Sequence, residues 1–214
     1  MREQVLSRQD AKAVTRQRLI DGALALARSE GLTALTTGRI AAQAGLAQSS
    51  FYVHFSDRAS CLREMGDVVG HQILDRIRAA QVALFAGLQR GDLQSANRAF
   101  HAAVFDAVLA DPELIEVFLK LRRETSSPAG EGLHQLERSA RDRVIDDMKA
   151  IGLDRAFGDD LGVFLDAVFG MIFGLTEGLL DGRNPDRARA VDMVARMTYP
   201  VLSEAVYRLG AAEA

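Results

Sequence analysis

Residues 36–55 read TTGRIAAQAGLAQSSFYVHF. Apolar residues recur at helical spacing on both sides of Gly45, and small alanines allow two short helices to cross closely. Ile40 and Ala41 in the first run can pack inward against Phe51 in the second, while Gly45 permits a tight turn between them. This is the sequence pattern of a helix-turn-helix. Neither helix is long enough to be stable alone, so both must pack against a neighbouring helix.

The rest of the chain also has helical periodicity. Alternating runs of β-branched and aromatic residues, which would indicate strands, are almost absent from the sequence. Glycine, proline and capping residues divide the chain into nine expected helices. They cover residues 11–30, 36–45, 48–55, 57–88, 93–109, 112–124, 133–151, 158–180 and 186–209. The segment 125–132, rich in Ser, Pro and Gly, is the clearest predicted loop. The sequence therefore predicts an all-α fold.

Charge is distributed unevenly along the chain. Residues 1–62 carry eight Lys or Arg and five Asp or Glu, whereas residues 63–214 carry eighteen and twenty-four. The first segment is therefore basic and the second acidic, although the formal net charge of the whole chain is only −3. This asymmetry indicates that only the N-terminal segment meets an anionic partner. We expect two domains, residues 1–62 with the helix-turn-helix and residues 63–214.

Cysteine content and apolar runs bear on the compartment. Cys61 is the single cysteine, so no disulfide can form within the chain, which fits a reducing environment. Residues 1–15 are polar and charged and lack the apolar segment of a secretory signal. The most apolar stretch, residues 161–180, contains Asp166 and Glu177, which favours a buried or interface helix over a membrane span. We expect a cytoplasmic protein without membrane contact.

Several N-terminal motifs carry a family resemblance. They lie in register between residues 16 and 62: Leu19-Ile20-Asp21-Gly22-Ala23, Gly31, Thr36, Ile40-Ala41, Ala44-Gly45, Phe51-Tyr52, His54-Phe55, Arg58 and Leu62. In these motifs the segment resembles the N-terminal domain of the TetR family of bacterial transcriptional regulators. Beyond residue 62 the chain resembles that family only in its length and helical character.

The resemblance implies an N-terminal three-helix DNA-binding domain followed by a C-terminal helical domain for ligand binding and dimerisation. It further implies a homodimer that binds a palindromic operator in double-stranded DNA, acts as a repressor and is released by a small ligand. Two recognition helices held about 34–36 Å apart would read successive turns of the major groove. At Ala47 relatives have a capping Ser or Thr, at Gln48 often a Lys, and at Val53 often a basic residue. The recognition helix is therefore poor in charge.

Nine residues are candidates for DNA contact: Thr36, Thr37, Arg39, Gln48, Ser49, Ser50, Tyr52, His54 and Arg58. Three of them, Gln48, Ser49 and Ser50, open the second helix of the motif, from which side chains reach base edges. Glutamine can pair with adenine, whereas serine is permissive. An alternative for Gln48 is a solvated surface side chain.

The remaining candidates are suited to phosphate contacts. Hydroxyls and free amides at the start of a helix bind phosphate, which favours Thr36 and Thr37. The resemblance implies phosphate contacts for Tyr52 and His54, for which the alternative is packing between adjacent helices. With an uncharged recognition helix, Arg16, Arg39 and Arg58 would supply most of the positive charge, although Arg58 can also be simply solvated.

Glycines recur every four residues along the predicted helix 158–180, at Gly170, Gly174, Gly178 and Gly182. Each glycine inside a helix costs about 1 kcal/mol relative to alanine, so close approach of another helix is expected to offset the loss. The resemblance implies that the last two helices pair with their copies in a four-helix bundle. The interface candidates are Gly170, Gly174, Gly178, Val194 and Val201. The alternative is close packing against a neighbour in the same chain.

An effector pocket is expected within residues 63–214. Its candidate residues are Met65, Phe85, His101, Phe105, Phe118, Arg122, Phe169 and Phe173. Such side chains suit an apolar ligand, with Arg122 or His101 as a polar contact. The alternative for the phenylalanines is that they belong to the hydrophobic core.

Motifs for catalysis or metal binding are lacking in the sequence. His71, His101 and His134 fall on three different predicted helices without the spacing of metal ligands, so we expect no metal and no cofactor. We also expect no enzyme activity. Two other classes of protein stay open: an all-helical enzyme, and an interaction module that retains a vestigial helix-turn-helix. A steep fall of DNA affinity with salt would distinguish a DNA-binding regulator from both.

Overall fold

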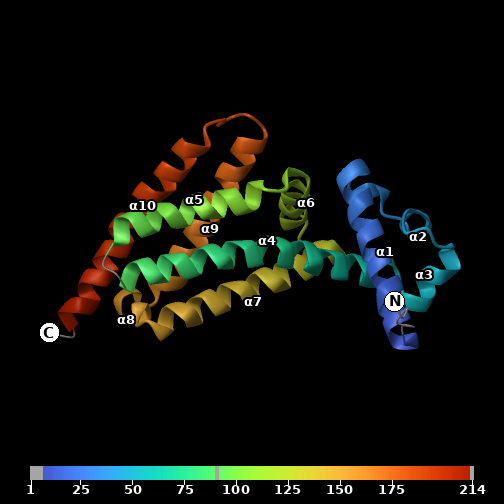
Figure 1. The fold of residues 1–214 in the computed structure, drawn as a ribbon, viewed down its shortest axis with the longest axis horizontal. Coiled ribbons are helices and arrows are strands. Elements are labelled where there is room, and N and C mark those ends of the chain that lie inside the picture. Colours follow the sequence, from blue (N-terminus) through green and yellow to red (C-terminus); the bar gives the residue numbers. More distant parts are fainter. Residues whose placement is uncertain (1–6, 90–91, 213–214) are drawn as a thin grey trace, which may run out of the picture. The chain divides into compact units, whose positions relative to one another are not determined.

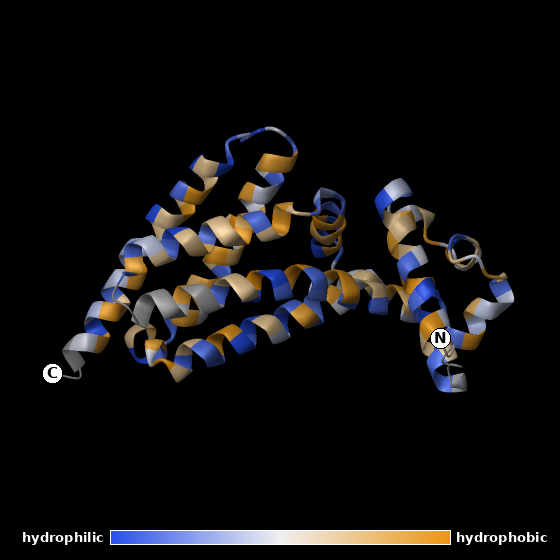
Figure 2. Ribbon diagram, viewed as in Figure 1, coloured by the Kyte–Doolittle hydropathy of each residue, from blue (hydrophilic) through white to orange (hydrophobic). Residues whose placement is uncertain are grey.

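The computed structural model describes residues 7–89 and 92–212, and within these ranges all regular structure is helical (Figure 1). The helices are α1 (Arg8–Glu30), α2 (Thr37–Gln43), α3 (Gln48–His54), α4 (Arg58–Gln89), α5 (Leu93–Leu109), α6 (Pro112–Arg123), α7 (Pro128–Ala150), α8 (Leu153–Phe157), α9 (Asp160–Leu180) and α10 (Arg187–Ala212), with a 3-10 turn at Leu32–Ala34. Figure 2 shows hydrophobic and hydrophilic residues interleaved along the long helices, as in amphipathic helices. The predicted all-α fold is confirmed.

Three details of the predicted helices are corrected. Within 125–132, predicted as a loop, α7 already begins at Pro128, because the Ser127 hydroxyl caps the amide of Gly130 at 3.0 Å and proline is well suited to a first turn. The short helix α8, bounded by Gly152 and Gly158 at positive φ, was not predicted. Gly182 lies beyond the end of α9 and has a φ of +76°, so it serves the turn and not the helix.

The chain divides into two compact units. The first comprises Met1–His71 and Glu116–Leu136, and the second comprises Gln72–Ile115 and Glu137–Ala214. The helices α4, α6 and α7 each contribute residues to both units.

In the first unit, α1 forms the support for α2 and α3. Leu19 of α1 and Ile40 of α2 are fully buried, and so is Phe51 of α3. Gly22 lets α1 and α2 approach closely, since an added Cβ would lie 3.1 Å from the carbonyl oxygen of Ile40. The three helices therefore share one apolar core, as expected for helices too short to be stable alone.

The first unit also contains a close crossing of α4 and α7. A Cβ added at Gly66 would lie 2.1 Å from the carbonyl oxygen of Ala129, and one added at Gly132 would lie 2.5 Å from that of Arg63. Both obstacles are backbone atoms, so the two helices can pack this closely only because glycine occupies these positions.

We expect Gly66→Ala to lower the free energy of unfolding by about 1–3 kcal/mol, because the helices must separate to admit the methyl group. The measurement is the midpoint of urea unfolding. Gly210→Ala in α10 is the matched control, since its Cβ would meet nothing within 4 Å among the described residues. An unchanged midpoint for Gly66→Ala would contradict the close crossing.

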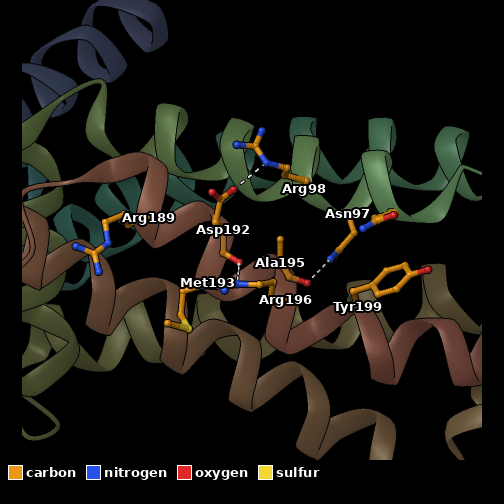
Figure 3. Close-up of a pocket in the computed structure, with 9 residues that line it drawn as sticks. Asn97, Arg98, Arg189, Asp192, Met193, Ala195, Arg196 and Tyr199 are labelled. Atoms are coloured by element: carbon orange, nitrogen blue, oxygen red, sulfur yellow. Dashed lines mark hydrogen bonds and ion pairs between the residues drawn. The ribbon is translucent and has the colours of Figure 1, made fainter.

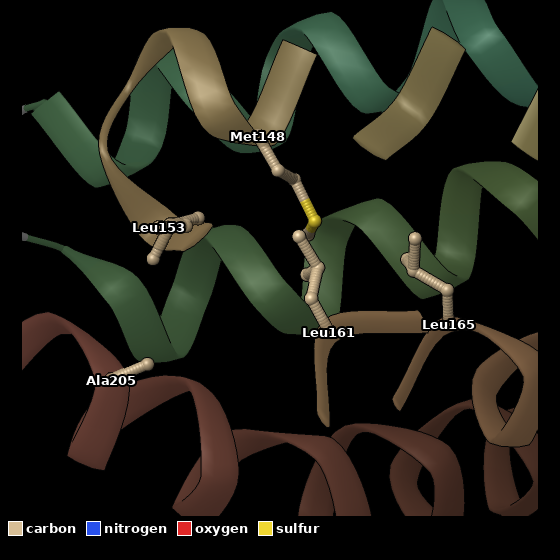
Figure 4. Close-up of a cluster of buried hydrophobic side chains, with 5 residues drawn as sticks. All are labelled: Met148, Leu153, Leu161, Leu165 and Ala205. Atoms are coloured by element: carbon tan, nitrogen blue, oxygen red, sulfur yellow. The ribbon is translucent and has the colours of Figure 1, made fainter. Parts of the chain in front are cut away.

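In the second unit, α10 packs against α5, α8 and α9. One apolar cluster joins Met148, Leu153, Leu161, Leu165 and Ala205. Figure 4 shows Met148 of α7 reaching toward Leu161 of α9. A second cluster joins Phe105 of α5 to residues 190–194 of α10. These clusters hold α5, α9 and α10 together.

The apolar helix α9 passes a length and composition test for a membrane span, the one helix among the described residues that does so, and 33% of the tested window is buried. A core helix of a water-soluble protein can pass the same test. Asp166 on α9 is exposed and forms an ion pair with Arg141 at 2.7 Å. An apolar helix that leaves positions such as Val163, Gly170 and Gly174 exposed is typical of an interface helix.

Candidate nucleic-acid interface and ligand cavity

The helix-turn-helix is built from α2, a tight turn and α3. Gly45 in the turn has a φ of +69°, and the amide of Leu46 donates to the Ala41 carbonyl at 2.9 Å. Phe51 is the buried residue of α3 and anchors that helix on the core. Because one face is fixed in this way, α3 presents its other face to solvent.

The exposed face of α3 gathers several predicted DNA contacts. Gln48 and Ser49 are exposed, and Ser50 is half-buried. Tyr52 is 55% exposed, which argues against the alternative that it packs between helices. Val53 is 65% exposed and leaves an uncharged surface beside it. The face is thus open and polar, with little charge of its own.

Three of these side chains lie together across α2 and α3. The Gln48 amide nitrogen donates to the Thr37 hydroxyl at 3.1 Å, and the Tyr52 hydroxyl lies 3.5 Å from the same oxygen. Thr36, just before α2, caps that helix by accepting from the amide of Arg39 at 3.4 Å. By contrast, Ala47 offers α3 no side-chain cap among the described residues, as the sequence predicted. The contacts of Thr37 hold Gln48 and Tyr52 in place before any ligand arrives.

The arginines expected to supply positive charge have partners within the first unit. Arg16 forms an ion pair with Glu64, donates to the His54 carbonyl and lies over the Phe55 ring at 4.0 Å. Arg16 therefore links α1 to the end of α3 and the start of α4.

Arg39 and Arg58 are also engaged. Arg39 pairs with Glu30, and Arg58 donates to the Leu35 carbonyl. The side chains of Arg39 and Glu30 are 47% and 46% exposed. Ion pairs this exposed are weak, so Arg39 could exchange Glu30 for a phosphate. Sequence reasoning missed these internal contacts.

His54 is half-buried at the end of α3. Burial lowers the pKa of His54, and the nearby charges of Lys12 and Arg16 lower it further. In the free protein the uncharged form of its ring is therefore favoured at neutral pH.

The family of the N-terminal domain follows from a match to this segment. The sequence profile of bacterial regulatory proteins of the tetR family matches residues 19–65. The match covers 47 of the 214 residues, and it assigns the TetR family to this segment alone. No curated protein sequence matches the chain closely enough to count as a relative.

Solved structures show that the TetR likeness extends to the fold of the whole chain. A structure described as a tetR family transcription regulator from Shewanella sp. PV-4 is 20% identical, with 87% of this chain and 96% of that chain covered and a TM-score of 0.64. A transcriptional regulator from Pseudomonas aeruginosa PAO1 is 20% identical over 95% of both chains, with a TM-score of 0.70. SmeT, the repressor of the Stenotrophomonas maltophilia multidrug efflux pump SmeDEF, is 19% identical, with 87% and 89% covered and a TM-score of 0.60. The chain has the fold of TetR-family transcription regulators.

The second unit contains a cavity of about 60 Å³. Its wall is formed by α4, α5, α7, α9 and α10. Four polar residues contribute to the wall, namely Gln81, Asn97, His101 and Thr198, and the other described lining residues are apolar. The cavity therefore has the mixture of a mainly apolar wall and a few polar groups that is typical of small-molecule sites.

Three of the polar residues form one hydrogen-bonded cluster. The Asn97 amide donates to the Ala195 carbonyl at 2.9 Å and to the Thr198 hydroxyl at 3.0 Å. His101 Nε2 lies 3.0 Å from the same hydroxyl. The cluster ties α5 to α10 inside the apolar core.

The predicted pocket residues have different places. His101 and Phe169 line the cavity. Phe105 and Phe173 are instead buried in the core, at 0% and 3% exposed, as the alternative interpretation expected. Met65, Phe118 and Arg122 belong to the first unit, where Met65 and Phe118 are fully buried, so they do not line this cavity. The side chain of Phe85 lies outside the described residues.

Sequence reasoning missed Gln81, Asn97 and Thr198 as lining residues. The helical spacing could have indicated Asn97, because Asn97 and His101 are four residues apart and share a face of α5 with the fully buried Val104 and Phe105. Polar residues at core positions usually have a specific partner or role.

Burial lowers the pKa of His101 to about 4. The unfolded chain, with an ordinary histidine pKa near 6.5, therefore takes up a proton before the folded protein does. We expect the free energy of unfolding to be unaffected by His101 protonation above pH 6.5. As the pH falls from 6.5 to 4, protonation of His101 in the unfolded chain should lower the free energy of unfolding by about 3 kcal/mol. Urea unfolding across this pH range measures it, with His101→Gln as the comparison. If the slopes of wild type and variant agree, His101 is not the titrating group.

A larger, open groove of about 460 Å³ lies between α5 and α10 (Figure 3). Arg98 pairs there with Asp192 at 2.8 Å, and Arg196 donates to the Asp192 carbonyl at 3.2 Å. Arg98, Asp192 and Arg196 are exposed or half-exposed. This groove is therefore a solvated, partly neutralised surface, in contrast to the mainly apolar cavity.

An exposed apolar face runs along α9 and α10. Val163 is 67% exposed, and Met193, Met197 and Val201, spaced four residues apart on α10, are 46%, 56% and 45% exposed. A groove of about 550 Å³ runs between α8, α9 and α10 beside this face.

The predicted interface residues divide between this face and the core. A Cβ at Gly170 or Gly174 would meet no described atom within 4 Å, so neither glycine serves close packing within the described part of the chain. By contrast, a Cβ at Gly178 would lie 2.7 Å from the Asn184 side chain, and Val194 is 0% exposed. Gly178 and Val194 are thus buried within the chain's own second unit, whereas Gly170, Gly174 and Val201 are exposed.

Proposed function

We propose that this protein is a homodimeric transcriptional repressor that binds a palindromic operator through α3 and is released by a small molecule in the cavity of its second unit. The observation that carries the proposal is the face of α3, where Gln48, Thr37 and Tyr52 are held together opposite the buried anchor Phe51. This arrangement is suited to the major groove, because side chains at the start of a recognition helix reach base edges.

Homodimerisation is supported by the exposed apolar face of α9 and α10. Large apolar side chains at four-residue spacing and glycines without a neighbour within the described chain form a surface that a second copy can cover. A dimer places two recognition helices on one duplex, and this explains why a short, weakly charged α3 would suffice.

Release by ligand would be a shift between two populations of the dimer. Gln81 of α4 lines the cavity, and α4 is the helix that follows α3 in the chain. In one population the two recognition helices have the spacing that the operator requires, and in the other they do not. A ligand that binds more tightly to the second population would lower the affinity for the operator. Equal ligand affinity for the free and DNA-bound protein would contradict this mechanism.

The test of the proposed function is selection of duplexes from a random DNA pool with the purified protein, followed by sequencing. We expect a palindrome with half-sites about one helical turn apart, and an affinity that falls steeply with salt. No enriched sequence at low salt would favour the alternative of an interaction module with a vestigial helix-turn-helix.

Gln48→Ala provides a sharper test on the selected duplex. We expect the loss of one base contact at each half-site to weaken binding by about 10-fold or more per half-site, since such a contact contributes about 1–3 kcal/mol. Fluorescence anisotropy measures the affinity, and Gln94→Ala, the same change on the exposed surface of α5, is the control. If both variants bind like the wild type, Gln48 does not read bases.

A further inference from the structure

The charge of the cavity wall restricts what it can hold. The described residues that line it include no Asp, Glu, Lys or Arg. An ion moved from water into such a site would lose its hydration without gaining a counter-charge, which is strongly unfavourable. The wall therefore selects against carboxylates, phosphates and organic cations.

Two residues that line the cavity have a polar atom without a partner among the described residues: Gln81 Nε2 and His101 Nδ1. Their residues are only 7% and 1% exposed, so bulk solvent has little access to them. Buried polar groups are nearly always hydrogen-bonded, and an exception calls for an explanation. A ligand with a suitable polar group would supply what these atoms lack.

The direction of each hydrogen bond follows from the neighbouring groups. The Gln81 amide nitrogen can only donate. The Thr198 hydroxyl lies 2.9 Å from the Val194 carbonyl, 3.2 Å from Asn97 Oδ1 and 3.0 Å from His101 Nε2. We assign its single proton to the Val194 carbonyl, the nearest of these acceptors, so that His101 Nε2 donates to the Thr198 oxygen. His101 Nδ1 then carries a lone pair and accepts. One neutral group that both accepts and donates is a hydroxyl.

We propose that the cavity binds a neutral, mainly apolar alcohol or phenol whose hydroxyl accepts from Gln81 and donates to His101. This inference rests on the proposed function only in treating the cavity as the effector site. The neutral state of His101 at physiological pH, which follows from its burial, agrees with an uncharged ligand.

The volume bears on ligand size. The cavity of about 60 Å³ is smaller than an apolar cavity of about 150 Å³ that holds benzene. An aromatic ligand therefore requires small movements of the wall, where Phe100, Phe164 and Phe169 are only half-buried and can turn.

The experiment compares four probes of similar size: phenol, toluene, benzoate and benzylammonium. Each is titrated into the full-length protein, and the methyl resonances of Ile77 and Met148 in the cavity wall are followed by NMR. We expect phenol to shift these resonances and to bind about 10-fold more tightly than toluene, with no saturable shift from benzoate or benzylammonium. Equal or tighter binding of toluene, saturable binding of either ion, or no shift with phenol would overturn the proposal.

Gln81→Leu tests the assigned contact. The substitution removes the unpartnered donor and keeps a side chain of similar size, so the protein is expected to fold. The ratio of phenol to toluene affinity should fall from about 10 to about 1, whereas Gln94→Leu on the exposed surface of α5 should leave it unchanged. A ratio that stays near 10 in Gln81→Leu would overturn the role of Gln81.

Binding of the selected operator by the same preparations separates this inference from the proposed function. Intact operator binding without a preference for phenol would refute only the assigned ligand class. A preference for phenol without operator binding would refute only the DNA-binding function.

Discussion

Phe51→Ala is expected to lower the free energy of unfolding by about 3–5 kcal/mol and to abolish operator binding. Phe51 is completely buried, and its ring lies 5.4 Å from that of Tyr52 and 5.5 Å from that of Phe55. Removing it leaves a cavity where α3 meets the core, and no other residue within α3 (Gln48–His54, all described) is buried. Urea unfolding and fluorescence anisotropy with labelled operator measure the two effects.

The control for Phe51→Ala is Val53→Ala, two residues further along the same helix. Val53 is 65% exposed, so its truncation should change stability by less than about 0.5 kcal/mol. Wild-type stability of Phe51→Ala would show that α3 is held in place by something other than this side chain.

Gly174→Leu is expected to dissociate the proposed dimer and to lower affinity for the proposed operator by about 100- to 10 000-fold, because the advantage of two linked half-site contacts is lost. Gly174 is exposed and a Cβ there meets no described atom of its own chain within 4 Å, so leucine should not disturb the fold of the protomer. Sedimentation velocity at nanomolar concentration and fluorescence anisotropy measure the two effects.

The matched control for the dimer is Gln94→Leu, which places the same side chain on the exposed surface of α5. It should leave both sedimentation and DNA affinity unchanged. A Gly174→Leu protein that is still fully dimeric would show that this face of α9 is not the interface.

The burial of Phe51 could be predicted from the sequence, whereas the exposure of Gly174 required the structure. The burial of Phe51 follows from helical periodicity, because residues three and four apart share a face. The turn at Gly45 follows from the steric freedom of glycine at positive φ. These local effects act over a few residues, so the helix-turn-helix and the all-α fold could be predicted from the sequence.

The limits of local reasoning appear at the end of α9. A repeat of four glycines predicted one continuous stripe, yet Gly182 belongs to a turn and Gly178 packs against Asn184. Of the glycines in this repeat that lie within α9, only Gly170 and Gly174 are exposed. Spacing shows which residues share a face, but not whether another part of the chain already covers it.

Interactions between distant residues required the tertiary structure. The pairing of Arg16 with Glu64 spans 48 residues, and the contact of His101 with Thr198 spans 97. No periodic pattern connects such positions, because their approach depends on how whole helices pack. Most of the helices, the turn and the buried anchor of α3 could be predicted from the sequence alone, because they depend on local sterics and apolar spacing. Only the packing of α4, α5 and α10 decided which polar side chains meet at the cavity, because each helix supplies just part of the wall.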